Sequence, residues 1–177
     1  MRRGGALVLW LAQGMGAGRL RPAPGTWGSL VGVAWTLALL VPGSPAWYGL
    51  GAAIGVALAI PACGLAETAL GEHDPPSVVL DEVVAMPLAF GGHVALWAWS
   101  GAGVPGLSTW KAWCFHLALA FVLFRMLDIW KPWPIRLLQR LPGGWGVVLD
   151  DVAAGMGAGL LLLLGTQGAF LLRLVAG

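Results

Sequence analysis

The sequence predicts an all-α membrane protein with about four or five membrane helices and an N-terminal helix at the membrane interface. Hydrophobic residues make up 58% of the 177 residues and charged residues only 10%, whereas soluble domains carry about 25% charged residues. The charged residues fall into a few segments separated by long charge-free stretches. Eleven tryptophans and 28 glycines are typical of helices that anchor at membrane interfaces and pack closely together. The chain length suits a single domain, residues 1–177.

The N-terminal segment allows two interpretations. Arg2 and Arg3 precede an apolar run from Ala6 to Ala12, which resembles a short signal peptide with a cleavage site near residues 15–17. The same run is also typical of a helix that lies on, or dips into, the membrane surface. We favour the interfacial helix.

The charge-free stretches predict the membrane helices in order. No charged residue lies between Arg21 and Glu67, a length that suits two helices joined by a turn at residues 42–45. A second such stretch, from residue 83 to residue 110, is interrupted by glycines and a proline at 101–106. The expected helices cover roughly residues 27–42, 46–66, 83–99, 110–127 and 152–172.

Five crossings place residues 1–26, 67–82 and 128–150 on one side of the membrane. Eight of the ten basic residues lie on or near that side, namely Arg2, Arg3, Arg19, Arg21, Arg125, Lys131, Arg136 and Arg140. Because basic loops face the cytoplasm, we expect this side to be cytoplasmic. The same side holds all eight carboxylates, namely Glu67, Glu72, Asp74, Asp81, Glu82, Asp128, Asp150 and Asp151. This one-sided acidic face predicts a site, and the net charge of +2 is too small to indicate nucleic-acid binding.

A short internal repeat indicates a metal site. Residues 78–85 match residues 147–154 at six of eight positions, and each copy places an acidic doublet, Asp81-Glu82 or Asp150-Asp151, at the expected start of an apolar helix. Helix capping explains one acid in each copy. It explains the second acid poorly, because adjacent like charges are costly near an apolar interface. Four converging carboxylates instead suit Mg²⁺, which prefers oxygen ligands.

The segment 124–136 carries a second candidate constellation. If its helix continues to Trp130, Arg125 and Asp128 share a face, and Pro132 ends the helix soon afterwards. Tryptophans and bases here also fit a membrane exit with interfacial anchors. That alternative leaves Asp128 unexplained, since an ionisable residue in an apolar helix is a functional candidate. Arg125 and Lys131 are suited to holding a phosphate.

A third segment is rich in glycine. Residues 14–18 and 21–30 combine glycines with the hydroxyls of Thr26 and Ser29, so their backbone amides can present donors to a phosphate. The segment lacks the Gly-Lys-Ser/Thr ending of a nucleotide-binding loop. A plain turn followed by a helix start remains the alternative.

Taken in chain order, these blocks resemble the bacterial phosphatidylglycerophosphatase A family. The blocks that carry the resemblance are 24–30, Asp74 with 81–84, 124–136 and 143–155. The third block is the most specific of them. Ala85 departs from the family pattern, which usually has glycine there, and this change should not remove a metal ligand.

The resemblance implies an Mg²⁺-dependent enzyme of the bacterial inner membrane that hydrolyses the terminal phosphomonoester of phosphatidylglycerophosphate at the cytoplasmic face. The implied metal ligands are Asp81, Glu82, Asp150 and Asp151, with Asp128 or Asp74 adding to them. The implied phosphate-binding residues are Arg125, Lys131, Arg136, Thr26 and Ser29. The candidate catalytic residues are Asp81, Glu82, Asp128, Asp150, Asp151 and Lys131. Either water or a carboxylate can be the nucleophile.

Two other classes of membrane protein fit the sequence less well. A CDP-alcohol phosphatidyltransferase needs a spaced Asp-Gly ladder that the sequence lacks. A non-enzymatic protein that uses the acidic face to bind ions or a partner predicts ionisable groups near helix centres. Here those groups cluster at helix ends and in loops, which favours the enzyme.

Overall fold

The computed structural model describes residues 3–101 and 110–176, and in these ranges the chain forms helices joined by turns, with no strand. The helices are α1 (Arg3–Ala12), the 3-10 helix η1 (Gly14–Arg19), α2 (Pro24–Leu40), α3 (Pro45–Leu70), α4 (Leu80–Trp99), α5 (Trp110–Trp130), α6 (Ile135–Leu138) and α7 (Gly144–Ala176). The all-α prediction is confirmed. Arg2 and most of the expected break at 101–106 lie outside the described residues.

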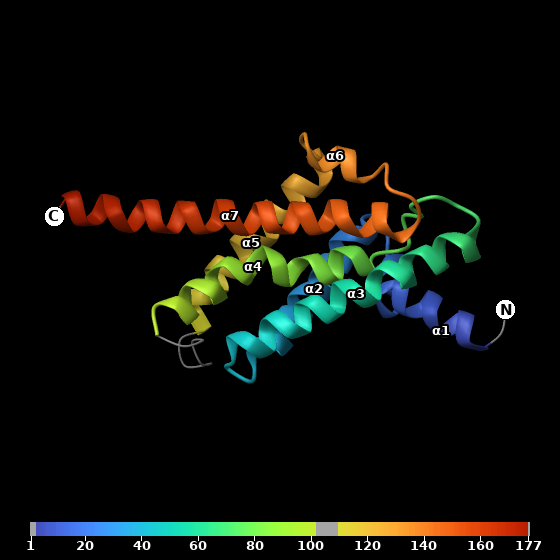
Figure 1. Cartoon of the computed structure of the whole chain (residues 1–177), viewed down its shortest axis with the longest axis horizontal. Coiled ribbons are helices and arrows are strands. Elements are labelled where there is room, and N and C mark those ends of the chain that lie inside the picture. The colour runs from blue at the N-terminus through green and yellow to red at the C-terminus, as the bar shows by residue number, and fades with distance from the viewer. Residues whose placement is uncertain (1–2, 102–109, 177) are drawn as a thin grey trace.

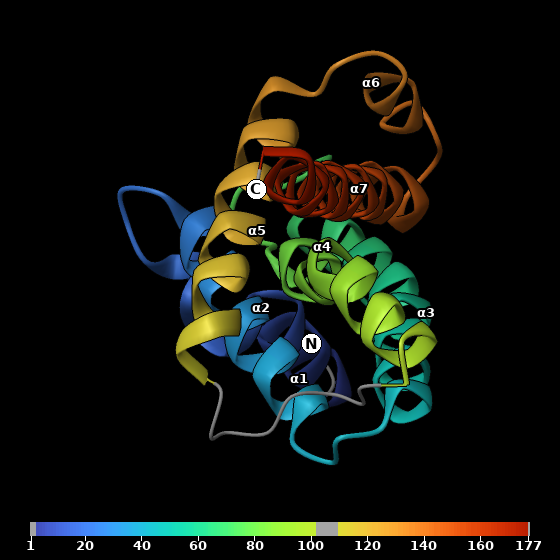
Figure 2. The ribbon, with the colours of Figure 1, turned by 90° about the vertical axis from the view of Figure 1, so that its left-hand side faces the viewer.

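Helix α4 forms the centre of the bundle. Figure 2 shows it surrounded by α2, α3, α5 and α7, and all four of these helices contact it. Ten of its residues are buried, among them Met86 and Phe90, which are fully enclosed. The acidic doublet at the start of α4 is therefore held by a helix of which half the residues are buried.

Within the described residues, three helices are long and apolar enough to cross a membrane. They are α3, residues 113–130 of α5 and residues 144–167 of α7. Helix α2 is apolar but shorter. The prediction of a helical membrane protein is thus confirmed, and the count of four or five crossings stays a prediction.

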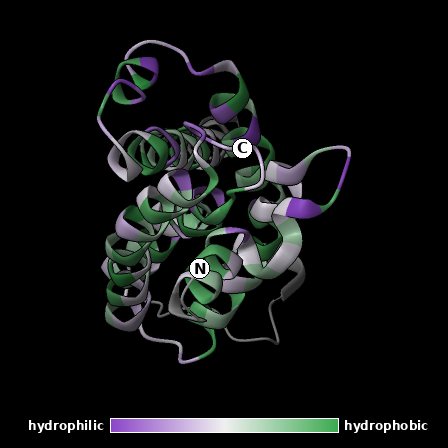
Figure 3. Ribbon diagram, turned by 90° about the vertical axis from the view of Figure 1, so that its right-hand side faces the viewer, coloured by the Kyte–Doolittle hydropathy of each residue, from purple (hydrophilic) through white to green (hydrophobic). Residues whose placement is uncertain are grey.

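The polar segments gather at one end of the bundle. The α3–α4 loop and the start of α7 lie toward the right of Figure 1, whereas the α2–α3 turn lies toward the left. Figure 3, viewed from the first end, shows hydrophilic residues in the turns and hydrophobic residues along the flanks of the helices. A membrane-embedded bundle with one polar end is the arrangement that the charge pattern predicts.

Several helix ends follow signals in the sequence. Ser44 caps α3 by accepting a hydrogen bond from the Trp47 amide at 3.3 Å, and Gly71 ends this helix in the left-handed conformation with φ of 69°. Helix α5 ends at Trp130, two residues before Pro132, as the sequence predicts.

The expected start of the last helix at residue 152 is wrong, because α7 begins at Gly144. Glycines at 143, 144 and 146 lower helix propensity, so the local sequence points to a loop. Packing against α3 overrides this preference: a Cβ on Gly144 would lie only 2.7 Å from the amide nitrogen of Gly64. Asp150 and Asp151 therefore lie inside α7 rather than at its N-terminus, and they do not cap it.

Glycines also allow close packing between α4 and α7. These two helices share the most extensive helix–helix contact in the described chain. A Cβ on Gly155 would lie 2.7 Å from the carbonyl oxygen of Ala85, and one on Gly159 would lie 2.9 Å from that of Leu88. Glycines four residues apart allow two helix backbones to approach closely. This contact sets the separation between the two acidic doublets.

Substituting Gly155→Ala tests this contact. We expect it to lower the free energy of unfolding by about 1–3 kcal/mol, because the new methyl group meets backbone that cannot move aside. Thermal unfolding of the detergent-purified protein measures the effect. Gly165→Ala on the same helix meets nothing within 4 Å and is the matched control. Equal stability of the two variants would contradict the proposed role of the α4–α7 contact.

Candidate active site

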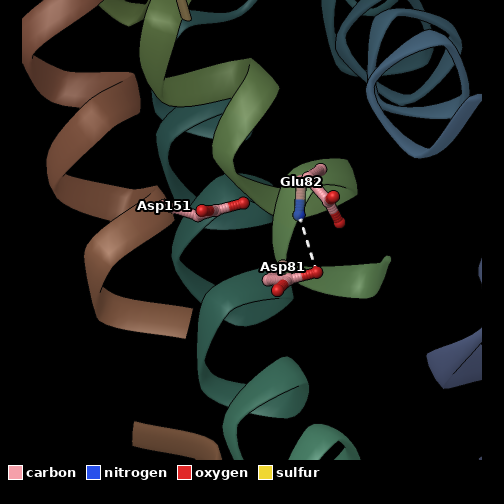
Figure 4. Close-up of side chains that lie close together, drawn as sticks. All are labelled: Asp81, Glu82 and Asp151. Carbon is pink, nitrogen blue, oxygen red and sulfur yellow. Dashed lines mark hydrogen bonds between the residues drawn. The ribbon is translucent and has the colours of Figure 1, made fainter. Parts of the chain in front are cut away.

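Three carboxylates from two helices meet near the polar end of the bundle. Asp81 and Glu82 come from the first turn of α4, and Asp151 comes from the neighbouring α7 (Figure 4). One oxygen from each carboxylate lies within 4.8 Å of the others. Asp81 is 6% exposed and Asp151 is 2% exposed. We call Asp81, Glu82 and Asp151 the carboxylate triad.

The triad has the chemistry of a site for a hard cation. Glu82 Oε2 and Asp151 Oδ2 are buried and have no hydrogen-bond partner among the described residues. Burial raises the pKa of Asp81, the neighbouring Glu82 charge raises it further, and burial also raises the pKa of Glu82. Buried like charges are unfavourable unless a cation offsets them. The residues present therefore fit Mg²⁺, which takes oxygen ligands.

Each acidic doublet contains the same type of local hydrogen bond. The Glu82 amide donates to Asp81 Oδ1 at 3.1 Å, and the Asp151 amide donates to Asp150 Oδ1 at 3.0 Å. Asp150 nevertheless differs from Asp81, because its other oxygen accepts a hydrogen bond from Lys131 Nζ at 2.5 Å. The predicted convergence of both doublets is therefore seen for three of the four carboxylates.

Two cations border the triad. Arg125 Nη1 lies 2.5 Å from Asp128 Oδ2 and 3.9 Å from Glu82 Oε1. Lys131 Nζ lies 3.8 Å from Asp128 Oδ1 in addition to its contact with Asp150. Asp128 thus links both cations, and Arg125 Nε is buried without a partner in the part of the chain that the structure describes. This free donor suits an anionic ligand.

The end of α5 directs Lys131 back into the protein. Lys131 has a φ of 43°, and its amide still donates to the Leu127 carbonyl at 2.8 Å. Arg125 and Asp128 lie three residues apart on the last turns of α5, as the sequence predicts. The C-terminal end of α5 therefore places Arg125 and Lys131 next to the acidic doublets.

The first turn of α2 lies against the same cluster. A Cβ on Gly25 would lie 3.1 Å from Arg125 Nη1 and would also collide with Glu82 Oε1. Ser29 Oγ donates to the Gly25 carbonyl at 2.8 Å and accepts from Arg125 Nη1 at 3.5 Å. Thr26 is half-buried in the same turn. The glycine-rich block therefore adjoins the site through Gly25 and Ser29.

Asp74 and Arg136 lie away from the triad. Asp74 is exposed in the α3–α4 loop, where it lines a cavity of about 220 Å³ together with His73, Gln139, Gly146 and Val147. Arg136 is exposed on α6 and forms no ion pair with any described carboxylate. The ligand and phosphate-binding roles given to these two residues stay predictions.

Sequence reasoning assigned no role to Glu67. This buried carboxylate, at the end of α3, accepts hydrogen bonds from His73 Nδ1 at 2.6 Å and from the Asp74 amide at 2.9 Å. It therefore fixes the α3–α4 loop. One feature of the sequence points to Glu67: it is the first acidic residue after a long charge-free stretch.

Sequence reasoning also missed Gln13. Its side chain is buried, accepts a hydrogen bond from Arg19 Nε at 2.8 Å and donates to Ser77 Oγ at 3.3 Å. The Val79 amide donates to the Ala12 carbonyl at 2.9 Å. Together these bonds attach α1 and η1 to the segment that leads into α4. A lone glutamine before a glycine run gives no sequence signal for this role.

Comparisons with known proteins place the chain in a family. The sequence profile described as Phosphatidylglycerophosphatase A matches residues 10–166. Phosphatidylglycerophosphatase A of Escherichia coli is 35% identical over 88% of this chain and 81% of its own length. The protein of that name from Haemophilus influenzae is 37% identical over 82% and 80%.

Another relative bears a different name. A Bacteroides thetaiotaomicron protein with the provisional name phosphatidylinositol-3-phosphatase is 33% identical over 92% of this chain and 95% of its own. No solved structure is a significant match. The profile match and the identities over most of both chains show that this protein belongs to the phosphatidylglycerophosphatase A family.

Proposed function

We propose that this phosphatase hydrolyses the terminal phosphomonoester of phosphatidylglycerophosphate in an Mg²⁺-dependent reaction that yields phosphatidylglycerol and inorganic phosphate. The observation that carries the proposal is the carboxylate triad, with two unpartnered buried oxygens, bordered by Arg125 and Lys131. Family membership supports the phosphatase activity, and the names of the E. coli and H. influenzae relatives support this substrate.

In the proposal, Asp81, Glu82 and Asp151 hold the Mg²⁺. When bound, the ion supplies positive charge to phosphate oxygens and lowers the pKa of a water molecule. The same positive charge removes the mutual repulsion of the three buried carboxylates. Asp150 and Asp128 remain on Lys131 and Arg125 and hold these two side chains in position.

Charge balance supports the proposal that a divalent cation is needed before phosphate can bind. With all groups ionised, the five carboxylates of the triad, Asp128 and Asp150 outnumber the cations Arg125 and Lys131 by three charges. A phosphate dianion would be repelled by that excess. A bound divalent ion offsets most of it, so the Arg125 guanidinium and the Lys131 ammonium can then bind the phosphate oxygens.

We further propose that the polar end of the bundle faces the cytoplasm of a bacterial cell. Eight of the ten basic residues belong to segments assigned to that side or lie close to them. The three apolar helices α3, α5 and α7 stay in the bilayer. The lipid can therefore remain in the membrane while its phosphate enters the site.

Phosphate release by the detergent-purified protein tests the function. We expect release from phosphatidylglycerophosphate in Mg²⁺, loss of release in EDTA, and recovery when Mg²⁺ is restored. Phosphatidylinositol 3-phosphate, presented in the same micelles, tests the other relative's substrate and should be hydrolysed more slowly. Faster release from the inositol lipid would overturn the substrate assignment. No release from either lipid with any divalent ion would favour the non-enzymatic alternative, in which the acidic face binds ions or a partner.

A further inference from the structure

An apolar groove runs along the outer side of α5. Figure 2 shows α5 at the edge of the bundle, beside α4 and α7. The groove has a volume of about 430 Å³, and all the residues that line it belong to α5, namely Phe121, Val122, Arg125, Met126, Ile129 and Trp130. We call this cavity the α5 groove.

The α5 groove lies on the side of the helix that faces the bilayer. Val122, Met126 and Ile129 follow one another at intervals of four and three residues, so their side chains project from the same face of α5. All three side chains are exposed, and residues 113–130 of α5 are long and apolar enough to cross a membrane. From Phe121 to Trp130 the groove extends about 13 Å along the helix axis.

The groove shares one side chain with the active site. Arg125 contributes to the lining of the groove, and its guanidinium group contacts Asp128 and lies 3.9 Å from Glu82 Oε1. The same residue therefore forms part of both walls. A ligand whose phosphate binds the Arg125 guanidinium is separated from the groove by no more than the length of this side chain.

The active site is least enclosed on the side of Arg125. Arg125 and Glu82 are half-buried, whereas Asp81 and Asp151 are buried. Gly25, in the first turn of α2, has no side chain that could cover this edge, and a Cβ there would lie only 3.1 Å from Arg125 Nη1. Helices α2 and α5 contact each other only over a short stretch. The site therefore opens at the boundary between α2 and α5, next to the α5 groove.

We propose that the α5 groove binds one acyl chain of the lipid substrate while its phosphomonoester is held at the carboxylate triad. This inference rests on the proposed function. The phosphate has to reach the site while the acyl chains stay in the bilayer, so the lipid must enter on a side of the site that faces the bilayer. Arg125 marks that side, because it borders Glu82 and also lines the groove. Since bilayer lipid is as apolar as the groove, the groove orients the substrate rather than extracting it from the membrane.

Substitutions that fill the α5 groove test this positioning role. We expect Val122→Trp and Met126→Trp each to lower kcat/KM for diacyl phosphatidylglycerophosphate about tenfold, because a displaced chain misplaces the phosphate. Hydrolysis of the deacylated, water-soluble headgroup should be unchanged, because that substrate has no chain to position. Leu160→Trp, on an exposed part of α7 outside the groove, is the matched control. Unchanged kcat/KM for the diacyl substrate in both groove variants would overturn the inference, as would equal losses with both substrates.

A photoreactive substrate tests occupancy of the groove independently of turnover. We expect phosphatidylglycerophosphate with a photoactivatable group in one acyl chain to label residues 121–130. Unlabelled phosphatidylglycerophosphate should compete at least about tenfold more effectively than phosphatidylcholine, since only the former carries a phosphomonoester for Arg125. Equal competition would identify an ordinary bilayer lipid in the groove and overturn the inference. If the groove is labelled selectively but the wild type releases no phosphate, the proposed reaction fails while the lipid site stands. Phosphate release without selective labelling would have the opposite meaning.

Discussion

Replacing Asp151 with asparagine is expected to lower phosphate release by more than about a hundredfold, since loss of partners outside the metal ligands alone typically costs about 10–100-fold. Asp151 supplies one of the three triad carboxylates, and its Oδ2 has no hydrogen-bond partner in the described chain. An amide of the same shape binds Mg²⁺ more weakly, because it lacks the negative charge. Initial rates at saturating Mg²⁺ and at a range of lower concentrations measure the loss.

The fold should survive the Asp151→Asn substitution. Removing one of several buried like charges relieves repulsion, so the metal-free variant is expected to unfold at a temperature no lower than that of the wild type. Glu72→Gln is the matched control, because Glu72 is an exposed carboxylate in the α3–α4 loop and its loss should leave activity unchanged. Full activity of Asp151→Asn would remove Asp151 from the metal site.

Replacing Lys131 with methionine is expected to lower both activity and stability. The substitution leaves Asp150, which is 2% exposed, without its cation. Breaking a buried pair typically costs 3–5 kcal/mol. Lys131 itself is 21% exposed, so we expect a loss of about 2–3 kcal/mol in the free energy of unfolding. Activity should fall at least about tenfold with the loss of the phosphate-binding ammonium.

A double variant separates the two effects of Lys131. Adding Asp150→Asn to Lys131→Met removes the orphaned charge and is expected to restore most of the lost stability, while activity stays low. Arg140→Met serves as the control, since Arg140 is an exposed cation that pairs with no described carboxylate. Recovery of activity together with stability would limit Lys131 to a structural role.

The sequence predicts the helical membrane fold and most of the residues that meet at the site. The internal repeat identifies both acidic doublets, and the spacing of Arg125 and Asp128 predicts that they share one face of α5. The sequence does not predict that Asp150 and Asp151 have different roles. Adjacent residues on a helix point about 100° apart, so once α7 begins at Gly144, Asp151 faces α4 while Asp150 faces Lys131.

The features that sequence reasoning misses depend on packing between distant segments. The early start of α7 depends on the approach of Gly144 to α3, which outweighs local helix propensity. The bond of Gln13 to Ser77 joins segments more than 60 residues apart. An apolar cavity of about 560 Å³ lies between α2 and α3, and its lining residues look like ordinary membrane-facing residues in the sequence.

Binding of Mn²⁺, used in place of Mg²⁺, tests the central claim that the carboxylate triad holds a divalent cation. The electron paramagnetic resonance signal of free Mn²⁺ is measured as the detergent-purified protein is added. The wild type should remove Mn²⁺ from solution, and excess Mg²⁺ should release it. Asp81→Asn and Asp151→Asn should each weaken binding by at least about tenfold, whereas Glu72→Gln should bind like the wild type. Unchanged Mn²⁺ binding in both triad variants would place the metal elsewhere and contradict the proposed site.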